Sequence, residues 1–304
     1  MPFTVCPVFS DFAAEIGDLD LSQPLSPEDL QAVKETFATY GVLVFTQQTL
    51  TEDQHVAFAR QLGPLETSIA VYRKDMRLRL RPEIADVSNI QASDDLWEKK
   101  SRNRMFSLGN RIWHTDSSFK YLPAYASILY ARSVAPIGGH TQYADMRAAY
   151  DALPEDMKAR LDGLIAEHSI FHSRARIGFT DFSEEERAKM PPVPQMLVRM
   201  LPDSGRRSLY VASHAGRIFG MPDAEGRALI DELIAHATRR QFIYTHRWRV
   251  GDLVMWDDRC TMHRGTDYDD LRWRRDFQRA TVSDVANTCE QAGVSLPPPA
   301  TGAA

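Results

Sequence analysis

The chain has 304 residues, of which 43% are hydrophobic and 25% are charged, a balance typical of a globular protein with a sizeable apolar core. Its formal net charge of −5 provides no overall basic surface for nucleic acid or anionic lipid, so we expect neither partner. The three cysteines, Cys6, Cys260 and Cys289, are odd in number and lack CxxC spacing. This argues against a disulfide framework or a structural zinc site and favours a cytoplasmic protein with reduced thiols.

In chain order, the first twenty residues contain acids early and lack the basic and apolar regions of a secretory signal. GVLVFT (41–46) is a short apolar, β-branched run after a glycine, which predicts a buried strand. Thr51 begins a segment with acids in its first turn, apolar residues at helical spacing and a glycine at position 63, which predicts a capped helix. Residues 84–90 and 125–134 have the composition of strands.

Further along, residues 144–164 predict two helices separated by Pro154, and residues 224–239 predict an amphipathic helix. Three strand-like runs follow, QFIYTHRW, DLVMWD and DFQRATV. No run approaches the ~18 apolar residues that cross a membrane. Short strands dominate the centre and the C-terminal third, with helices mainly on the flanks. This pattern predicts a mainly β fold, either an antiparallel sandwich or a jelly roll with helical cover.

A histidine and an aspartate lie two residues apart in the segment Trp113-His114-Thr115-Asp116. In an extended segment, side chains at i and i+2 point to the same side, so His114 and Asp116 would present an imidazole and a carboxylate to one point. This pair is two-thirds of the two-histidine, one-carboxylate arrangement that binds Fe(II) and leaves coordination positions open. HxD also occurs in ordinary surface loops, so the prediction requires a third ligand.

The third ligand is sought among the other histidines of the chain. His55 and His236 lie in predicted helices, where partly exposed side chains are expected. His168 and His172 lie in a strand-like stretch and fit a core or lining position. His263 is the favoured candidate because it follows a predicted strand and begins a loop that leads to a pair of arginines.

Those arginines are Arg275 and Arg279, twelve and sixteen residues after His263. Because alternate residues of a strand share a face, Arg275, Phe277 and Arg279 would all point inward or all outward. Two inward arginines would be costly unless anions bind them. The planar guanidinium binds carboxylates through two hydrogen bonds, as an enzyme with two anionic reactants requires. The alternative is that both arginines face solvent on an edge strand.

Four segments together resemble the motifs of a known family. They are WHTDSSF (113–119), GGHTQYADMRAAYDALP (138–154), VGDLVMWDDRCTMHR (250–264) and RRDFQRAT (274–281). In this order they are similar to the taurine/2,4-dichlorophenoxyacetate dioxygenases, a family that depends on Fe(II), 2-oxoglutarate and O₂. The strings FARQLGPLE and HRWRVGDLVMWD are most similar to the 2,4-dichlorophenoxyacetate branch.

The resemblance covers the chain from about residue 41 to residue 284. It implies one domain over residues 1–304 that is built as a double-stranded β-helix, a distorted jelly roll, with flanking helices and a loose tail from about residue 290. It also implies a homo-oligomer. By position, it assigns His114, Asp116 and His263 to the iron, Thr141 and Arg275 to the distal carboxylate of 2-oxoglutarate, Arg279 to the anionic end of the prime substrate, and Asn110 to the lining of the substrate pocket.

The reaction that the resemblance implies is hydroxylation of an aryloxyalkanoate, such as 2,4-dichlorophenoxyacetate, next to its ether oxygen. The product collapses to a phenol and glyoxylate, with succinate and CO₂ formed from the cosubstrate. Segment 68–81 would be a lid over the substrate, but it departs from the family pattern. Apolar Val71 stands where an anion-contacting residue is usual, so Tyr72, Arg73 or Lys74 could take over this contact.

Three alternatives stay open from the sequence. The same chemistry could act on taurine, another sulfonate or an alkyl sulfate, because Arg279 would serve any anion. A zinc-dependent hydrolase could use the same three ligands, although the arginine pair would then have no purpose. A jelly-roll binding module without catalysis is the third, but it would not need all three ligand positions.

Overall fold

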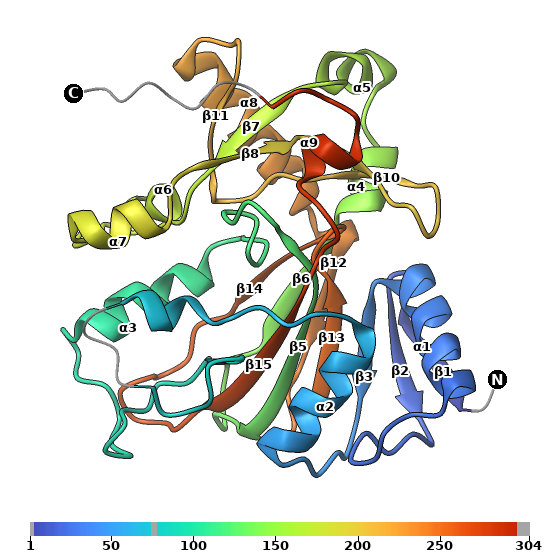
Figure 1. The fold of residues 1–304 in the computed structure, drawn as a ribbon, viewed down its shortest axis with the longest axis vertical. Coiled ribbons are helices and arrows are strands. Elements are labelled where there is room, and N and C mark those ends of the chain that lie inside the picture. Colours follow the sequence, from blue (N-terminus) through green and yellow to red (C-terminus); the bar gives the residue numbers. More distant parts are fainter. Residues whose placement is uncertain (1–2, 74–77, 297–304) are drawn as a thin grey trace.

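The computed structural model of the protein describes residues 3–73 and 78–296. Its largest element is a seven-stranded sheet in the order β1-β2-β3-β13-β5-β15-β4 (Figure 1). In this order the strands span Thr4–Phe9, Ala13–Gly17, Val42–Phe45, Leu253–Asp257, Ala124–Ser133, Asp276–Ser283 and Ile84–Asp86. Neighbouring strands are antiparallel, except for the parallel pair β2 and β3.

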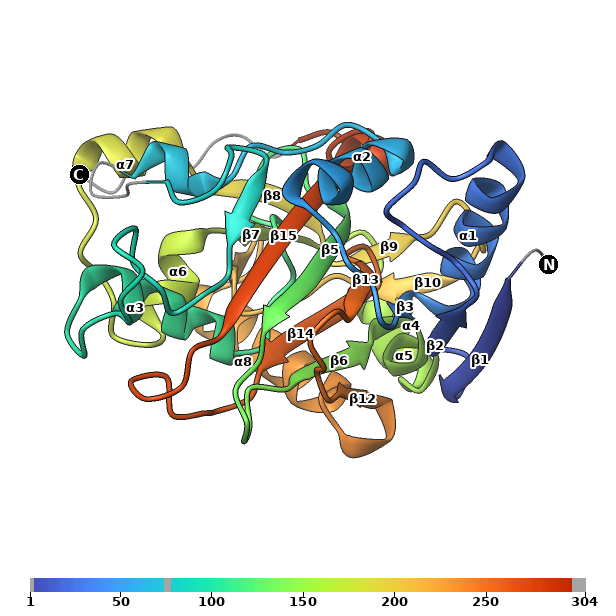
Figure 2. The same ribbon diagram turned by 90° about the horizontal axis from the view of Figure 1, so that it is seen from below.

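A three-stranded antiparallel sheet in the order β12-β6-β14 lies against one face of the main sheet (Figure 2). Its strands span Ile243–His246, Thr141–Asp145 and Thr261–Gly265. An apolar cluster joins the two sheets, and it includes Tyr143 of β6, Trp256 of β13 and Phe277 of β15. Strands of both sheets also contribute residues to the candidate site, such as His263 of β14 and Arg279 of β15.

Helices cover the opposite face of the main sheet (Figure 1). They are α1 (Pro27–Tyr40) and α2 (Glu52–Leu62), and their apolar residues form one buried cluster with the sheet. Helix α2 begins as predicted: Thr51 accepts a hydrogen bond from the backbone N–H of Gln54, and the Gln54 side chain completes the capping box. Gly63 follows its last residue, so both predicted ends of this helix are confirmed.

The remaining elements form a second region beside the two sheets (Figure 1). Its strands are β7 (Ile165–His168), β8 (Val193–Met196), β9 (Val198–Met200), β10 (Arg207–Leu209) and β11 (Ala215–Ile218). Its helices are α4 (Met146–Asp151), α5 (Glu155–Leu161), α6 (Ile170–Ala175), α7 (Glu184–Lys189), α8 (Asp223–Ala237) and α9 (Thr288–Gln291). Short helical segments complete the chain: η1 (Ile69–Tyr72), α3 (Arg102–Ser107), η2 (Leu108–Arg111) and η3 (Arg240–Phe242).

The predicted elements are mostly present, and the mainly β fold with flanking helices is confirmed. The strand predicted over residues 84–90 ends at Asp86, because Asn89 uses its side chain to bond loop carbonyls and the backbone N–H of Arg275. His172 lies on α6 and not in a strand. Near residue 290 the chain still forms α9, with Cys289 buried, whereas residues 297–304 of the expected loose tail lie outside the described residues. Among the described residues, no helix has the length and apolar character needed to cross a bilayer.

The prediction that His55 lies on a partly exposed helix face is wrong. Its ring is fully buried between α2 and the main sheet, with Nε2 3.1 Å from the carbonyl oxygen of Ile128. Burial lowers the pKa of His55 to about 4, an effect larger than the opposing hydrogen bond with Ile128.

The stability of the fold should therefore fall as the pH is lowered from about 6.5 to about 4. In this interval the unfolded chain binds a proton on His55 near its ordinary pKa, whereas the folded chain stays neutral, so protons favour unfolding. His55→Gln removes this contribution and still offers an amide donor to Ile128. Between pH 7.5 and pH 4.5, we expect the unfolding free energy of the wild type to fall by about 1–3 kcal/mol relative to the variant, measured by urea unfolding. If the difference in unfolding free energy between the wild type and His55→Gln is the same at both pH values, His55 does not have a lowered pKa in the folded protein.

Candidate active site

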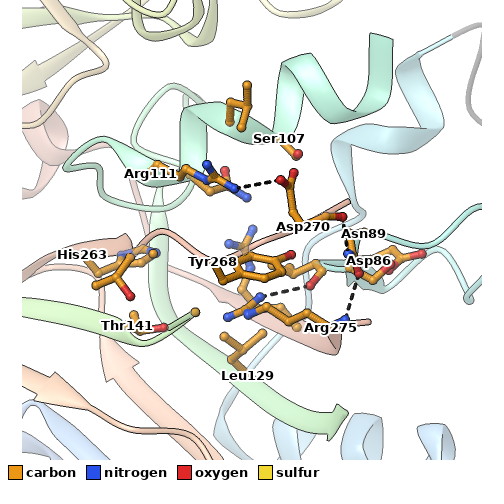
Figure 3. A pocket seen from close by; sticks show the side chains of 18 of the residues that line it. Asp86, Asn89, Ser107, Arg111, Leu129, Thr141, His263, Tyr268, Asp270 and Arg275 are labelled. Carbon is orange, nitrogen blue, oxygen red and sulfur yellow. Dashed lines mark hydrogen bonds and ion pairs between the residues drawn. The ribbon is translucent and has the colours of Figure 1, made fainter. Parts of the chain in front are cut away.

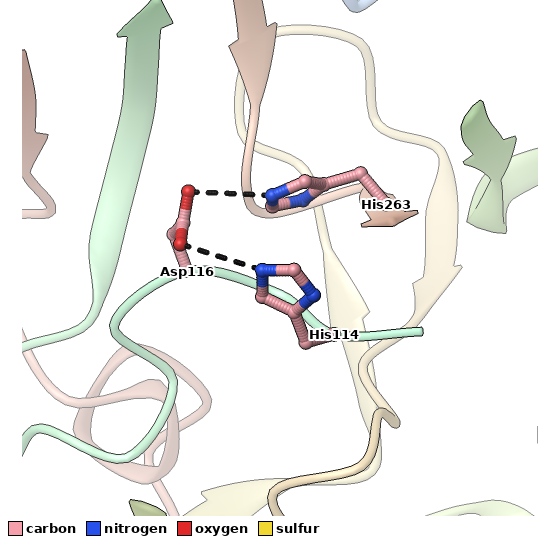
Figure 4. Close-up of side chains that lie close together, drawn as sticks. All are labelled: His114, Asp116 and His263. Atoms are coloured by element: carbon pink, nitrogen blue, oxygen red, sulfur yellow. Dashed lines mark ion pairs between the residues drawn. The ribbon is translucent and has the colours of Figure 1, made fainter. Parts of the chain in front are cut away.

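The three predicted metal ligands lie together in the structure (Figure 4). Backbone hydrogen bonds of 2.9 and 2.7 Å join His114 to His263 of β14, so one antiparallel bridge places the HxD segment beside this strand. The chain then turns, and Asp116 points back toward both imidazoles. Its Oδ2 lies 3.5 Å from Nε2 of His263, and its Oδ1 lies 3.9 Å from Nε2 of His114. One ligand atom from each residue lies within 4.8 Å of the other two.

The protonation of the two imidazoles suits metal binding. Nδ1 of His114 lies 2.9 Å from the carbonyl oxygen of Ile112, which fixes the ring proton there and leaves the Nε2 lone pair free. Burial lowers the pKa of His114 to about 4 and that of His263 well below its ordinary value. Both rings are therefore neutral at pH 7, as metal ligation requires.

The third ligand, Asp116, is held as an anion. Burial alone would raise its pKa, but the Arg279 guanidinium, 2.5 Å away, and the two imidazoles lower the pKa of Asp116 to about 2. Ser127 donates a further hydrogen bond of 3.1 Å to its Oδ2. Two neutral imidazoles and one carboxylate at one point form a donor set that fits a divalent iron with open coordination positions.

Asp258 contacts the backbone of Asp116, and no motif in the sequence indicated this residue. Its Oδ1 accepts hydrogen bonds from the backbone N–H of Asp116 at 3.2 Å and from Nε1 of Trp256 at 3.0 Å. Burial and the neighbouring Asp116 raise the pKa of Asp258 well above its ordinary value. Its carboxyl thus holds the backbone of Asp116 in position beside the two imidazoles.

A first pocket opens beside the triad and contains the predicted anion-binding residues (Figure 3). Arg275 is buried there, with its guanidinium 3.7 Å from the ring centroid of Phe277. Its side chain has no carboxylate partner among the described residues and only a 3.4 Å hydrogen bond to the carbonyl oxygen of Val87. Thr141 accepts a 2.9 Å hydrogen bond from Nε1 of Trp248, so its own hydroxyl proton remains available for a ligand. The pocket can therefore bind a carboxylate at the end that holds Arg275 and Thr141.

The rim of the first pocket consists of residues that the sequence analysis did not anticipate. The loop before β15 contributes Tyr268 and Asp270 to the lining. Arg111 of η2 pairs with Asp270 at 3.5 Å, and the Asn89 amide donates to the carbonyl oxygen of Asp270 at 2.7 Å (Figure 3). These contacts join segments that are more than 150 residues apart, so no local pattern could reveal them.

A second pocket reaches the triad from the side of α3 and α6. Its lining includes aromatic and aliphatic side chains, among them Trp97, Phe106, Phe119 and Ile170. Three arginines, Arg73, Arg174 and Arg279, also line it, as does the buried His214. Asn110, His114 and Arg279 line both pockets, so the two cavities meet beside the metal ligands.

The predicted lid residues are only partly brought to this site. Arg73 is buried in the second pocket, where it donates a 2.8 Å hydrogen bond to Asn103 and lies over Phe106. Val71 is 38% exposed and is absent from the described lining of either pocket, so the structure does not place it against a substrate. Tyr72 is likewise exposed, and Lys74 lies outside the described residues.

The arginines of segments 73–81 and 272–279 have two different roles: some form ion pairs within the fold, and others line the site. Arg79 pairs with Asp86 at 2.8 Å and with Asp276 at 2.6 Å, and Arg274 pairs with Asp94. Arg275 and Arg279 instead point inward, so the alternative in which both face solvent is wrong.

The fold and this site define a mainly β protein with a buried two-histidine, one-carboxylate centre. Residues 4–281 match the family described as taurine catabolism dioxygenase TauD, TfdA family. The chain belongs to this family, which confirms the predicted resemblance and makes it a dioxygenase.

Two relatives and one solved structure span nearly the whole chain. The alpha-ketoglutarate-dependent 2,4-dichlorophenoxyacetate dioxygenase of Cupriavidus pinatubonensis is 45% identical over 281 residues, which are 92% of this chain and 97% of that protein. The (S)-phenoxypropionate/alpha-ketoglutarate-dioxygenase of Sphingobium herbicidovorans is 37% identical, over 94% of this chain and 96% of that protein. The crystal structure of AAD-2 in complex with Mn(II) and N-oxalylglycine superposes with a TM-score of 0.87 at 42% identity, over 95% of this chain and 99% of that one.

Proposed function

We propose that this dioxygenase uses Fe(II), 2-oxoglutarate and O₂ to hydroxylate an aryloxyalkanoate next to its ether oxygen. The observation that carries the proposal is the meeting of two pockets at the buried triad. One contains Arg275, which has no carboxylate partner among the described residues, and the other is lined in part by the aromatic rings of Trp97, Phe106 and Phe119. His114, Asp116 and His263 would hold the iron. Bound Fe(II) supplies the activation of O₂, coupled to decarboxylation of 2-oxoglutarate to succinate and CO₂.

The first pocket would hold 2-oxoglutarate. Arg275 offers a buried, bidentate contact for the distal carboxylate, and Thr141 offers one further hydrogen-bond donor. Trp256 and Leu129 contribute apolar lining that excludes water around the cosubstrate. The crystal structure of AAD-2 in complex with Mn(II) and N-oxalylglycine, an analogue of 2-oxoglutarate, supports this assignment.

The second pocket would hold the prime substrate. Its aromatic and aliphatic lining suits a substituted phenyl ring better than the short, zwitterionic taurine. Arg279 would meet the carboxylate, and Asn110 would lie at the boundary between the two reactants. Hydroxylation of an aryloxyacetate gives a hemiacetal that collapses to a phenol and glyoxylate. The zinc hydrolase and the binding module do not agree with membership in a dioxygenase family.

Anaerobic loading with Fe(II) and 2-oxoglutarate, followed by O₂ and a panel of substrates, tests the proposal. The panel contains aryloxyalkanoates, cinnamates and taurine, and both succinate and the organic product are measured. Succinate formation coupled to phenol release is the expected result. Succinate coupled only to sulfite release would move the substrate to sulfonates, and no consumption of 2-oxoglutarate with any compound would overturn the proposal.

Arg279→Ala should raise the KM for the aryloxyalkanoate far more than it lowers the content of bound metal. The truncation removes a charge-assisted contact of about 1.5–3 kcal/mol, which corresponds to roughly 10- to 150-fold in affinity. Steady-state kinetics and metal analysis of the loaded variant measure the two effects separately. Unchanged substrate affinity would show that the role assigned to Arg279 is wrong.

We further infer that the two facing sheets form a double-stranded β-helix. Successive strands alternate between the sheets, from β5 to β6 and again from β12 through β13 and β14 to β15, which supports this interpretation. Residues 1–304 would then form one domain around this core. The homo-oligomer and the cytoplasmic location stay predictions, for light scattering and cell fractionation to test.

A further inference from the structure

Arg174 on α6 is a buried cation that faces the second pocket, and the function proposed above does not use it. Only 4% of its surface is exposed. Its guanidinium lies 4.3 Å from the ring centroid of Phe106, and its Nη2 lies 3.4 Å from Oδ1 of Asn110. Nη1 donates to the Ser173 hydroxyl at 3.3 Å, whereas Nε is buried and has no hydrogen-bond partner in the part of the chain that the structure describes. No carboxylate pairs with Arg174 among the described residues.

Three other buried arginines of this chain are paired with aspartates. Arg147 pairs with Asp145 at 3.2 Å, Arg199 with Asp284 at 2.5 Å and Arg259 with Asp257 at 2.8 Å. Arg174 differs from these three and shares the unpaired state of Arg275, to which the proposed function assigns an anionic ligand. Keeping an uncompensated charge away from water is costly unless an anion binds it.

The position of the guanidinium depends on a glycine. A Cβ atom built on Gly109 would lie 2.3 Å from Nη1 and 2.4 Å from Cζ of Arg174. The guanidinium therefore lies directly against the backbone of η2, between Gly109 and the ring of Phe106. The position of the guanidinium is therefore fixed by α3, which carries Phe106, and by η2, which carries Gly109.

Arg174 also lies within electrostatic reach of the metal centre. Burial and the nearby Arg73 lower the pKa of Arg174 to about 9, so the side chain keeps its charge at pH 7.5. Its positive charge lowers the pKa of His114 and of His214. In turn, Asp116 raises the pKa of Arg174 and Arg279 lowers it. Arg279, by contrast, already binds Asp116 through Nη1 at 2.5 Å.

We propose that Arg174 binds the carboxylate of the prime substrate together with Arg279, and that it selects anionic over neutral aryloxy compounds. The inference rests on the function proposed above. A carboxylate next to the carbon that is hydroxylated must lie close to the metal, where the second pocket holds both arginines. Asn110 and Phe106 hold the Arg174 fork in place, and the long 3.4 Å hydrogen bond from Nη2 to Asn110 leaves this end of the fork able to donate to a carboxylate oxygen.

Binding of 2,4-dichlorophenoxyacetate and of its primary amide to the enzyme loaded with Mn(II) and 2-oxoglutarate, without O₂, tests this role. Arg174→Met should weaken binding of the acid by about 10- to 100-fold, the effect of one charge-assisted hydrogen bond. Binding of the amide should change by less than about threefold, because it offers no charge. The matched control is Arg176→Gln. Arg176 lies two residues after Arg174, is exposed and pairs with Asp231, so this variant should bind the acid as tightly as the wild type.

Thermal unfolding distinguishes ligand binding from a structural role. Arg174→Met should not lower the melting temperature, because no carboxylate loses its partner. Arg199→Met should lower it, because Asp284 is then buried without its cation. Gly109→Ala should displace the Arg174 guanidinium and, like Arg174→Met, weaken binding of the acid. The double variant should bind the acid no more weakly than Arg174→Met alone.

Two results would overturn the role of Arg174. One is an acid affinity of Arg174→Met within about twofold of the wild type, and the other is an equal loss for acid and amide. Binding of 2-oxoglutarate should be unchanged in this variant, because Arg174 is absent from the lining of the first pocket. A wild type that consumes no 2-oxoglutarate with any aryloxyalkanoate would overturn the proposed function as well, whereas an active wild type with an unaffected variant would overturn only this inference.

Discussion

Asp116→Ala is expected to abolish turnover, with at least a 1,000-fold loss of substrate-dependent succinate formation. A bound metal contributes several kcal/mol to such a reaction, and each 1.4 kcal/mol corresponds to roughly tenfold in rate. The carboxylate is the only anion among the three ligands, and it also neutralises Arg279 at 2.5 Å. Its removal leaves two neutral imidazoles beside an unpaired guanidinium, an arrangement that repels a divalent cation.

Two measurements show whether Asp116→Ala loses activity through loss of the metal or through loss of the fold. Metal content after anaerobic loading should fall together with succinate formation, whereas far-ultraviolet circular dichroism should remain that of the wild type. Asp231→Ala is the matched control, because this aspartate is exposed on α8 and its ion pair is with the surface residue Arg176. Succinate formation by Asp116→Ala at more than a few per cent of the wild-type rate would show that the carboxylate is not a metal ligand.

Arg275→Met is the second change with a large expected effect, a rise of about 30- to 3,000-fold in the KM for 2-oxoglutarate. Loss of one partner of a buried, hydrogen-bonded charge pair costs about 2–5 kcal/mol, and 1.4 kcal/mol is tenfold in affinity. Arg275→Lys should recover only part of this loss, because an ammonium cannot form the two parallel hydrogen bonds of the guanidinium. Thr141→Val removes a neutral donor and should cost only about two- to tenfold.

The measurement on the Arg275 variants must distinguish weaker binding of 2-oxoglutarate from weaker binding of the prime substrate. Calorimetric titration of 2-oxoglutarate into the metal-loaded protein reports the first pocket alone. The melting temperature of the unliganded variant should not fall, because Arg275 has no carboxylate partner among the described residues. If 2-oxoglutarate binds the variant as tightly as the wild type, its distal carboxylate does not contact Arg275.

The local parts of the site could be predicted because they depend on spacing within one element. The capped helix from Thr51 to Gly63 follows from hydrogen-bonding chemistry that is complete within a dozen residues. The inward direction of Arg275 and Arg279 follows from the two-residue period of a strand, once one of them is known to be buried. The side-by-side placement of His114 and Asp116 was anticipated on the same basis, although the segment forms only a single bridge before it turns.

Other features depend on elements that are distant in sequence. His55 is buried because α2 packs against β5, and the helical pattern alone could not say how closely. Asp258 differs from the many exposed aspartates only in lying behind Asp116. Arg174 carries no motif, and its unpaired charge is visible only when the side chains of α3, η2 and α6 are seen together. The family position predicts a substrate contact for Val71, but 38% of this residue is exposed and it lines neither of the two pockets.

The class of chemistry could therefore be inferred from the residues alone, because the types and order of the ligands, glycines and arginines are local properties of the chain. Which charges are paired and which remain free for a ligand became clear from the folded chain. The physical reason is that the cost of burying a charge depends on every neighbour within a few ångströms, and folding draws those neighbours from all parts of the sequence.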